Sequence, residues 1–544
     1  MNETNFQQHV ETFVMWHAER SPTSATNMGI HTWDHKLADC RLEAIEDEAA
    51  GLEKFLQEFQ ACQSSNYTND GQVDHTLVVQ LIKSMLRNHN EMSHHRRNPG
   101  YYLSEILNGV FSLILKDFAP WQQRQESLAA RITAAPAVLN EAKKNLEPAS
   151  VPRVWAEVAL EQARMGPGLF LQMLPAMADS PEAAERLKEA GRETAAAMDD
   201  FARWLSEAVL PQAAGDFAVQ TPLFDQLLKE NHMVDYDSEE LLATGWKLFE
   251  ETKTQMETLA QQIDPHKTVE EIIEDAKNNH PSADGLLDAV RRAMEAARSF
   301  VMEKNIATIP EGEQLEIIET PLFLRPLIPF AAYIPPGIYD KSLTGVYMTT
   351  PPNPDDSPEV AKGKLKGQHY AKLPVTALHE AYPGHHLQLV TAVKNGTTAR
   401  KLGLHLSTLF IEGWAFYCEE LMEQTGFIAE PVQKLGRLHD QLWRAARIIL
   451  DVSLHCKGMS IDEAVDFLVT RCQLEPANAL AEIRRYTLSP TQPQSYLMGK
   501  LEIMKLVEEY KQKHPDTTLK TMHDHILACG SLPPRLLHKA LFAQ

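Results

Sequence analysis

The residues best able to do chemistry are concentrated in the segment HEAYPGHH, residues 379–386. Zinc hydrolases commonly carry His-Glu-x-x-His on a helix, because a four-residue step puts two imidazoles on one face and the Glu can act on water at the metal. Here Pro383 occupies the four-step position. Proline ends a helix and glycine permits unusual dihedral angles. Pro383-Gly384 can therefore turn His385 back toward the side where His379 points.

Apolar residues flank this segment on both sides, which indicates that its polar side chains are buried. Burying a glutamate and three imidazoles without partners is costly, so a metal site is favoured over a helix end that happens to hold histidines. Alignment with the usual motif gives His379 and His385 as zinc ligands and leaves His386 for the layer around them or for substrate binding. The opposite choice between His385 and His386 stays open. Glu380 has no other evident duty and is the predicted general base.

Zinc needs a third protein ligand and an open position for water. Glu412 begins the apolar helical stretch EGWAFYCEEL, far enough after His379 for one helix to end and another to pack antiparallel against it. We predict one Zn²⁺ held by His379, His385 and Glu412. Alternatively, Glu412 is an acid that favours a helix amino terminus. Glu419 and Glu420 are competitors, and their spacing is more typical of a solvated face or of a layer behind the ligands.

Residues further along the chain could assist catalysis. Peptide hydrolysis passes through an oxyanion, and Tyr496 is the predicted donor to it. Arg485 and Lys500 are candidate ligands for a substrate carboxylate, although a capping tyrosine and surface cations are the alternative interpretation. A further stripe at four-residue spacing could orient the metal ligands or form a buried ion pair. Its members are Arg447, Asp451 and His455.

The elements that must position these residues are mostly helices. Amphipathic patterns separated by Pro or Gly fill residues 1–305, and helical sequence returns after about residue 365. We predict a mainly α, two-lobed protein with a helical scaffold or cap lobe at 1–305. A catalytic lobe at 306–544 would hold a small β element near residues 306–350, and we expect the two lobes to form one continuous structural unit. Within that element, Gly345–Thr350 is either an edge strand that an extended peptide joins or an interior strand.

Composition excludes several classes of protein. The 544 residues include 52 Lys and Arg against 74 Asp and Glu, a net charge of −22, which disfavours a nucleic-acid partner. No run of about 18 apolar residues and no basic, apolar leader is present, so neither a membrane span nor export is predicted. The six cysteines are scattered and typical of reduced thiols. We expect a cytoplasmic protein, and the oligomeric state is not encoded in any pattern.

The motif at 379–386, EGWA at 412–415 and PQSYLMGK at 493–500 together resemble those of the bacterial domain-of-unknown-function 885 family. The resemblance runs through most of the chain, with its distinctive motifs within about 345–500. That family is predominantly helical and is regarded as similar to gluzincin metallopeptidases. The resemblance implies a metal-dependent hydrolase and leaves its substrate open.

These observations predict a zinc-dependent peptidase that acts on short peptides. A site in a deep channel between helical lobes would exclude folded proteins, and a carboxylate-binding pair of cations would favour carboxypeptidase or dipeptidase action over cleavage within a chain. Two other classes remain: a zinc-dependent amidase or esterase for a small molecule, and a metal-free helical binding or scaffold protein.

Overall fold

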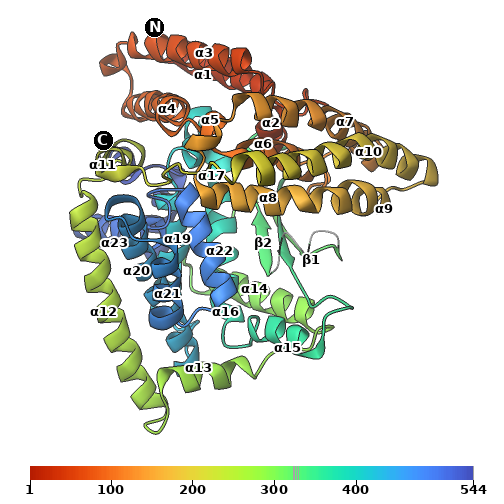
Figure 1. The fold of residues 1–544 in the computed structure, drawn as a ribbon. Helices are drawn as coiled ribbons and strands as arrows, with labels where there is room; N and C mark the ends of the chain where they lie inside the picture. Colours follow the sequence, from red (N-terminus) through yellow and green to blue (C-terminus); the bar gives the residue numbers. More distant parts are fainter. Residues whose placement is uncertain (323–324, 326–327, 329, 543–544) are drawn as a thin grey trace. The chain divides into compact units, whose positions relative to one another are not determined.

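The structure, a computed structural model, describes residues 1–544 except 323–324, 326–327, 329 and 543–544. It is mainly α with one three-stranded sheet, which confirms the predicted fold class (Figure 1). The chain divides into two compact units, residues 1–219 with 337–341 and residues 220–336 with 342–544. No helix in the described part of the chain is long and apolar enough to cross a membrane.

This division differs from the predicted one at residue 305. Helices α12 (Ser238–Ile263) and α14 (Leu286–Glu303) precede that residue but belong to the second unit. There α12 packs along α20 (Pro431–Cys456), and α14 packs against α16 (Leu373–Glu380). Sequence periodicity identifies such helices without showing which core each one joins.

The first unit is a helical assembly around a core to which Tyr102, Ile132 and Phe201 contribute. Its fully buried Arg131 donates hydrogen bonds to the carbonyl of Gly109 at 2.6 Å and to the hydroxyl of Thr26 at 2.7 Å, which ties three helices together. Its α-helices are α1 (Glu3–Arg20), α2 (Pro22–Met28), α3 (Leu42–Gln60), α4 (Asn69–Arg87), α5 (His94–Arg97), α6 (Pro99–Phe111), α7 (Trp121–Asn145), α8 (Arg153–Gly168), α9 (Leu174–Ala176) and α10 (Pro181–Trp204).

The second unit holds the sheet, in the order β1-β3-β2. Strand β1 (Glu313–Glu319) is parallel to β3 (Leu343–Thr349), and β2 (Ala331–Ile334) is antiparallel to it, with Tyr333 opposite Tyr347. Because β3 lies between the other two, residues Gly345–Thr350 take the interior position and not the edge. The remaining helices of this unit are α11 (Gln220–Leu227), α13 (Val269–Lys277), α15 (Pro358–Lys366), α17 (His385–Asn395), α18 (Thr398–Lys401), α19 (Leu409–Gln424), α21 (Ile461–Cys472), α22 (Pro476–Leu488), α23 (Ser495–Lys513), α24 (Leu519–Ala528) and α25 (Pro534–Phe542).

Helices α19 and α23 approach each other through glycines. A Cβ atom on Gly413 would lie 2.3 Å from the carbonyl carbon of Gly499, and one on Gly499 would lie 2.1 Å from the carbonyl oxygen of Leu409. Only residues without a side chain allow the two backbones to come this close. The approach matters for the site, because Glu412 and Tyr496 stand beside these glycines on the two helices.

Candidate metal centre

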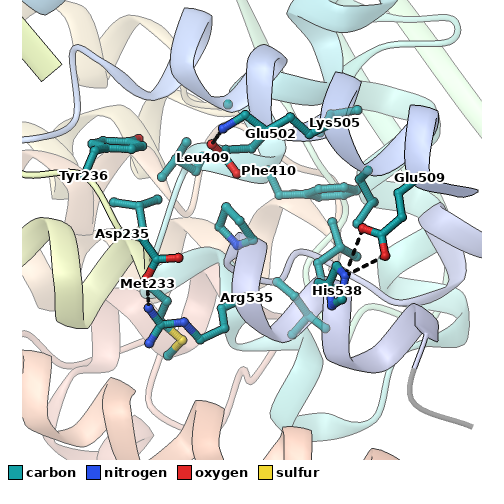
Figure 2. A pocket seen from close by; sticks show the side chains of 17 residues that line it. Met233, Asp235, Tyr236, Leu409, Phe410, Glu502, Lys505, Glu509, Arg535 and His538 are labelled. Carbon is teal, nitrogen blue, oxygen red and sulfur yellow. Dashed lines mark hydrogen bonds and ion pairs between the residues drawn. The ribbon is translucent and has the colours of Figure 1, made fainter. Parts of the chain in front are cut away.

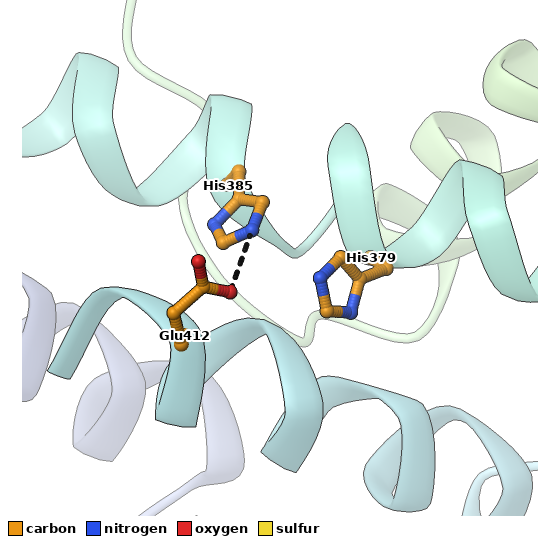
Figure 3. A group of neighbouring side chains, drawn as sticks. All are labelled: His379, His385 and Glu412. Atoms are coloured by element: carbon orange, nitrogen blue, oxygen red, sulfur yellow. Dashed lines mark ion pairs between the residues drawn. The ribbon is translucent and has the colours of Figure 1, made fainter. Parts of the chain in front are cut away.

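The three side chains that the sequence assigns to zinc meet within the second unit. His379 lies in the last turn of α16, His385 is the first residue of α17, and Glu412 lies in the first turn of α19. One potential ligand atom from each lies within 4.8 Å of the others (Figure 3). The ring centroids of the two imidazoles are 4.8 Å apart and the rings are nearly perpendicular. Nε2 of His385 is 3.4 Å from Oε2 of Glu412. The structure thus brings His385, and not His386, to this cluster.

The turn between α16 and α17 makes this arrangement possible. The backbone N–H of Gly384 donates to the carbonyl of Leu378 at 3.0 Å. A Cβ atom at Gly384 would lie 1.9 Å from the carbonyl oxygen of His379, so only glycine fits. The indole N–H of Trp414 donates to the carbonyl of Pro383 at 2.7 Å and ties the turn to α19. The Pro-Gly insertion therefore reverses the chain tightly enough to bring both histidines together.

His379 has a buried carboxylate behind it. Its Nδ1 atom lies 2.8 Å from Oε1 of Glu419, whose side chain is only 2% exposed. A carboxylate accepts hydrogen bonds, so the ring proton is on Nδ1 and the lone pair on Nε2 is left for a metal. Glu419 and Glu420 were the alternatives to Glu412 as the third zinc ligand. The structure places Glu419 against the predicted ligand His379.

His386 occupies a different environment from the one predicted for a substrate-binding residue. Its side chain is fully buried, with Nδ1 2.9 Å from the Tyr333 hydroxyl and Nε2 2.8 Å from a carboxylate oxygen of Glu313. Both ring nitrogens are therefore already engaged. Burial raises the pKa of Glu313, but hydrogen bonds from His386, Tyr382 and Arg298 lower it below its usual value. Nothing in the alternating pattern of β1 indicated that Glu313 would lie behind the histidine motif.

Glu380, the predicted general base, is the last residue of α16 and is half-buried. Within the described part of the chain it has no hydrogen-bond partner. Burial lowers the pKa of His385, but the neighbouring Glu412 carboxylate, with the charges of Glu380 and Glu419, raises it overall. Glu380 is therefore close enough to the cluster to act on it electrostatically, and its carboxylate is uncommitted among the described residues.

Tyr496, the predicted oxyanion donor, lies in the first turn of α23. Its ring centroid is 4.4 Å from the guanidinium carbon of Arg447. Burial and then the charge of Glu412 raise the pKa of the phenol, so the hydroxyl keeps its proton at neutral pH. Its proximity to Glu412 is compatible with a donor role at the same site.

The two predicted carboxylate ligands are engaged elsewhere. The Lys500 side chain is 4% exposed, and its Nζ lies 2.5 Å from a carboxylate oxygen of Glu420 and 2.9 Å from the amide oxygen of Gln441. This buried ion pair leaves Lys500 without the freedom that a substrate contact requires. Arg485 is 38% exposed and donates to Glu482 at 2.9 Å. Four-residue spacing correctly put Lys500 on the helix with Tyr496 but could not show the acid on α19.

The stripe on α20 mainly joins that helix to α22. Arg447 donates to the carboxylate of Glu482 and to the hydroxyl of Tyr486, both at 3.1 Å. Asp451 and His455 are fully buried, 3.9 Å apart, and burial raises the pKa of Asp451. Of the three, Arg447 is the one whose charge reaches the cluster, where it helps to lower the pKa of Glu412.

The residues present fit a zinc ion. Two imidazoles and one carboxylate are a ligand set of catalytic zinc, and a tetrahedral ion with bonds of about 2.1 Å spaces its ligands about 3.4 Å apart. Burial raises the pKa of Glu412, but His385, His379 and Arg447 lower it to about 2, so the residue is an anion at neutral pH. Within the described residues, the buried Oε2 atom of Glu412, which lies 3.4 Å from Nε2 of His385, has no hydrogen-bond partner. Such atoms are expected where a cation binds.

A pocket of about 410 Å³ also lies in the second unit and does not include the candidate ligands (Figure 2). Leu409 and Phe410 of α19 form part of its apolar wall. Its charged side chains pair with one another, as in the His538–Glu509 contact of 3.0 Å and the Lys505–Glu502 contact of 2.7 Å. This mutual pairing makes the pocket a poorer candidate for catalysis than the histidine cluster.

A family model described as "Bacterial protein of unknown function (DUF885)" matches residues 22–541. A structure titled as a putative lipoprotein of unknown function from Shewanella oneidensis is 24% identical, with a TM-score of 0.80 and 99% of both chains covered. Another, titled as the putative lipoprotein from Colwellia psychrerythraea, is 16% identical, with a TM-score of 0.81 and 98% of both chains covered. No curated protein sequence matches the chain.

Proposed function

The chain belongs to the DUF885 family of bacterial proteins of unknown function, and we propose that it is a zinc-dependent peptidase that acts on short peptides. The observation that carries the proposal is the cluster of His379, His385 and Glu412, whose potential ligand atoms lie within 4.8 Å of one another. A likeness to gluzincin metallopeptidases, which the family resemblance implies, is part of the same proposal.

Different residues of the chain would bind the metal, transfer the proton and stabilise the oxyanion. A bound Zn²⁺ would lower the pKa of water and polarise the substrate carbonyl. His379, His385 and Glu412 would hold the ion, with Glu419 fixing the ring of His379. Glu380 would accept the proton of the attacking water and pass it to the leaving amine. Tyr496 would donate its hydroxyl proton in a hydrogen bond to the oxyanion of the substrate.

Metal content is the first test. Elemental analysis of protein purified without chelators is expected to give about one zinc per chain. The His379→Ala and Glu412→Ala variants are expected to lose it. Less than about a tenth of a zinc in folded protein would reject the metal site and favour the metal-free binding or scaffold class.

Activity is the second test, because the same groups could hydrolyse an amide or ester of a small molecule. Zinc-loaded protein incubated with a mixed pool of short peptides is expected to release products that mass spectrometry detects. Zinc without peptide cleavage would move the proposal to the amidase or esterase class.

Cellular location remains a proposal as well. Sequence features favour the cytoplasm, whereas the titles of the two similar structures call those proteins lipoproteins. Fractionation of the native bacterium decides between the two: recovery in the soluble cytoplasmic fraction supports the first, and recovery with lipid-modified membrane proteins supports the second.

A further inference from the structure

A group of nitrogen donors beside Tyr496 has no acceptors. Within the described residues, the buried indole Nε1 of Trp443, Nε of Arg444 and Nη1 of Arg447 have no hydrogen-bond partner. All three residues lie on little more than one turn of α20. Buried donors nearly always find acceptors in folded proteins, so three together call for an explanation.

These donors lie around one another and around the Tyr496 ring. The guanidinium carbon of Arg447 is 4.4 Å from the Tyr496 ring centroid and 4.5 Å from that of Trp443. The guanidinium carbon of Arg444 is 5.8 Å and 5.2 Å from the same two centroids. Stacking on two aromatic rings holds the guanidinium planes in place and leaves their edges for hydrogen bonds.

The charges of this group do not balance. Arg447 and Arg485 share one carboxylate, that of Glu482, at 3.1 and 2.9 Å. Arg444 pairs with Asp440 at 3.2 Å. With Arg485 included, three guanidinium groups therefore have two carboxylate partners at ion-pair distance, one fewer than the number of cations. A single negative charge compensates this difference.

The group also lies beside the candidate metal centre. Tyr496 is on α23 next to the glycine contact with α19, which carries Glu412. The guanidinium carbon of Arg444 also lies 5.5 Å from the ring centroid of Phe416, which follows Glu412 by about one turn on α19. A ligand bound here would thus lie near the histidine cluster.

We propose that Trp443, Arg444 and Arg447 form a binding site for the carboxyl-terminal carboxylate of a short peptide, next to Tyr496. Planar guanidinium groups match the geometry of a carboxylate, and the one uncompensated charge suits a monoanion better than a phosphate dianion. The choice of a peptide as the ligand rests on the proposed peptidase function. It replaces the carboxylate contacts predicted at Arg485 and Lys500 and makes removal of residues from the carboxyl end the expected mode of cleavage.

Binding of a minimal ligand tests the site directly. N-acetyl-phenylalanine and its carboxamide differ only at the carboxyl group, and calorimetry of the full chain as purified measures the affinity for each. The free acid is expected to bind roughly 10-fold to 100-fold more tightly than the amide, the range for charge-assisted hydrogen bonds. Equal affinities, or no binding of the acid, would overturn the proposal.

Variants identify the donors. Arg447→Gln is expected to remove most of the preference for the acid, but it also unpairs Glu482 and could unfold the unit. Arg444→Gln and Trp443→Phe keep that ion pair, and each is expected to weaken acid binding by roughly 5-fold or more. The matched control is Arg471→Gln, because Arg471 also stacks on aromatic rings, those of Phe249 and Phe467, but is 49% exposed. Folded Trp443 and Arg444 variants with full preference for the acid would reject the site.

The metal content of every variant separates this proposal from the peptidase. Acid preference in a protein without zinc would retain the anion site and reject the metal centre. Zinc and peptide cleavage without acid preference would retain the peptidase and reject the anion site. With both intact, free-acid peptides are expected to be trimmed and amidated peptides to resist, and the Arg444→Gln defect is expected mainly in KM.

Discussion

The Nδ1 atom of His379 lies 2.8 Å from Oε1 of Glu419, a carboxylate that is almost completely buried on α19. This contact fixes the ring orientation and makes the other nitrogen a better electron-pair donor. It links α16 to α19, the helix that also carries Glu412.

The first prediction concerns this contact. Glu419→Gln keeps the shape of the side chain but removes its charge, so zinc affinity is expected to fall roughly 10-fold to 100-fold. Competition with a fluorescent chelator measures the change. Glu359→Gln on the exposed surface of α15 is the matched control and is expected to bind zinc normally. Unchanged affinity in the Glu419 variant would show that the contact only supports packing.

The second prediction separates the base from the ligands. Glu380→Gln is expected to retain zinc and folding while turnover falls by at least about two orders of magnitude, because the amide cannot accept the proton of water. Turnover on a cleaved peptide and elemental analysis are the two measurements. Loss of zinc together with turnover would instead make Glu380 a ligand, and Glu359→Gln again serves as the control.

The sequence predicted which side chains converge in the cluster better than it predicted their surroundings. His379, Glu380 and His385 are close in the chain, and the properties of Pro and Gly suffice to predict that they converge. Glu412 required only one further helix. In contrast, Glu313 comes from a strand far upstream, and its contact with His386 depends on how β1 packs against the motif. Local periodicity holds no information about such a contact.

The contacts of basic side chains show the same limit of prediction from sequence. Sequence spacing gave Arg485 and Lys500 as carboxylate ligands, but spacing cannot show whether a cation already has an acid partner. Glu420 pairs with Lys500, and Glu482 pairs with both Arg485 and Arg447. The mainly α class was predictable, because amphipathic periodicity repeats along most of the chain, whereas the unit boundary at residue 219 depends on long-range packing.

The third prediction concerns the glycine contact of α19 and α23. Gly499→Ala places a methyl group 2.1 Å from the carbonyl oxygen of Leu409, so the two helices must move apart. We expect a lower melting temperature, corresponding to about 1–3 kcal/mol of destabilisation, because a backbone atom cannot give way as a flexible side chain can. Calorimetry measures the shift.

A matched substitution in α20 controls for the loss of glycine itself. Gly436 has open space where its Cβ would lie, so Gly436→Ala is expected to leave stability unchanged or to raise it by about 0.5–1 kcal/mol. Equal melting temperatures for the Gly499 and Gly436 variants would show that the helices tolerate a wider separation. Reduced zinc affinity in Gly499→Ala alone would show that the contact positions Glu412.

The fourth prediction concerns acid stability. Burial lowers the pKa of His232 and of His523 from 6.5 to about 4, and both lie in the second unit. Between pH 6.5 and about pH 4, each histidine binds a proton in the unfolded chain but not in the folded chain. The contribution of these two neutral histidines to the free energy of unfolding is therefore complete above pH 6.5 and is lost as the pH falls toward 4. From pH 7 to pH 5 each histidine is expected to remove about 2 kcal/mol of stability.

Thermal unfolding at a series of pH values measures this loss. His232 donates or accepts hydrogen bonds at Ser407 and Thr491, at 2.8 and 3.0 Å, so His232→Gln is expected to unfold at a lower temperature at pH 7. Its melting temperature should nevertheless fall less steeply between pH 7 and pH 5 than that of the wild type, since one proton-binding difference is gone. The surface substitution His266→Gln should keep the wild-type slope, because His266 is exposed. An unchanged slope in His232→Gln would show that this buried imidazole is not a source of the pH dependence.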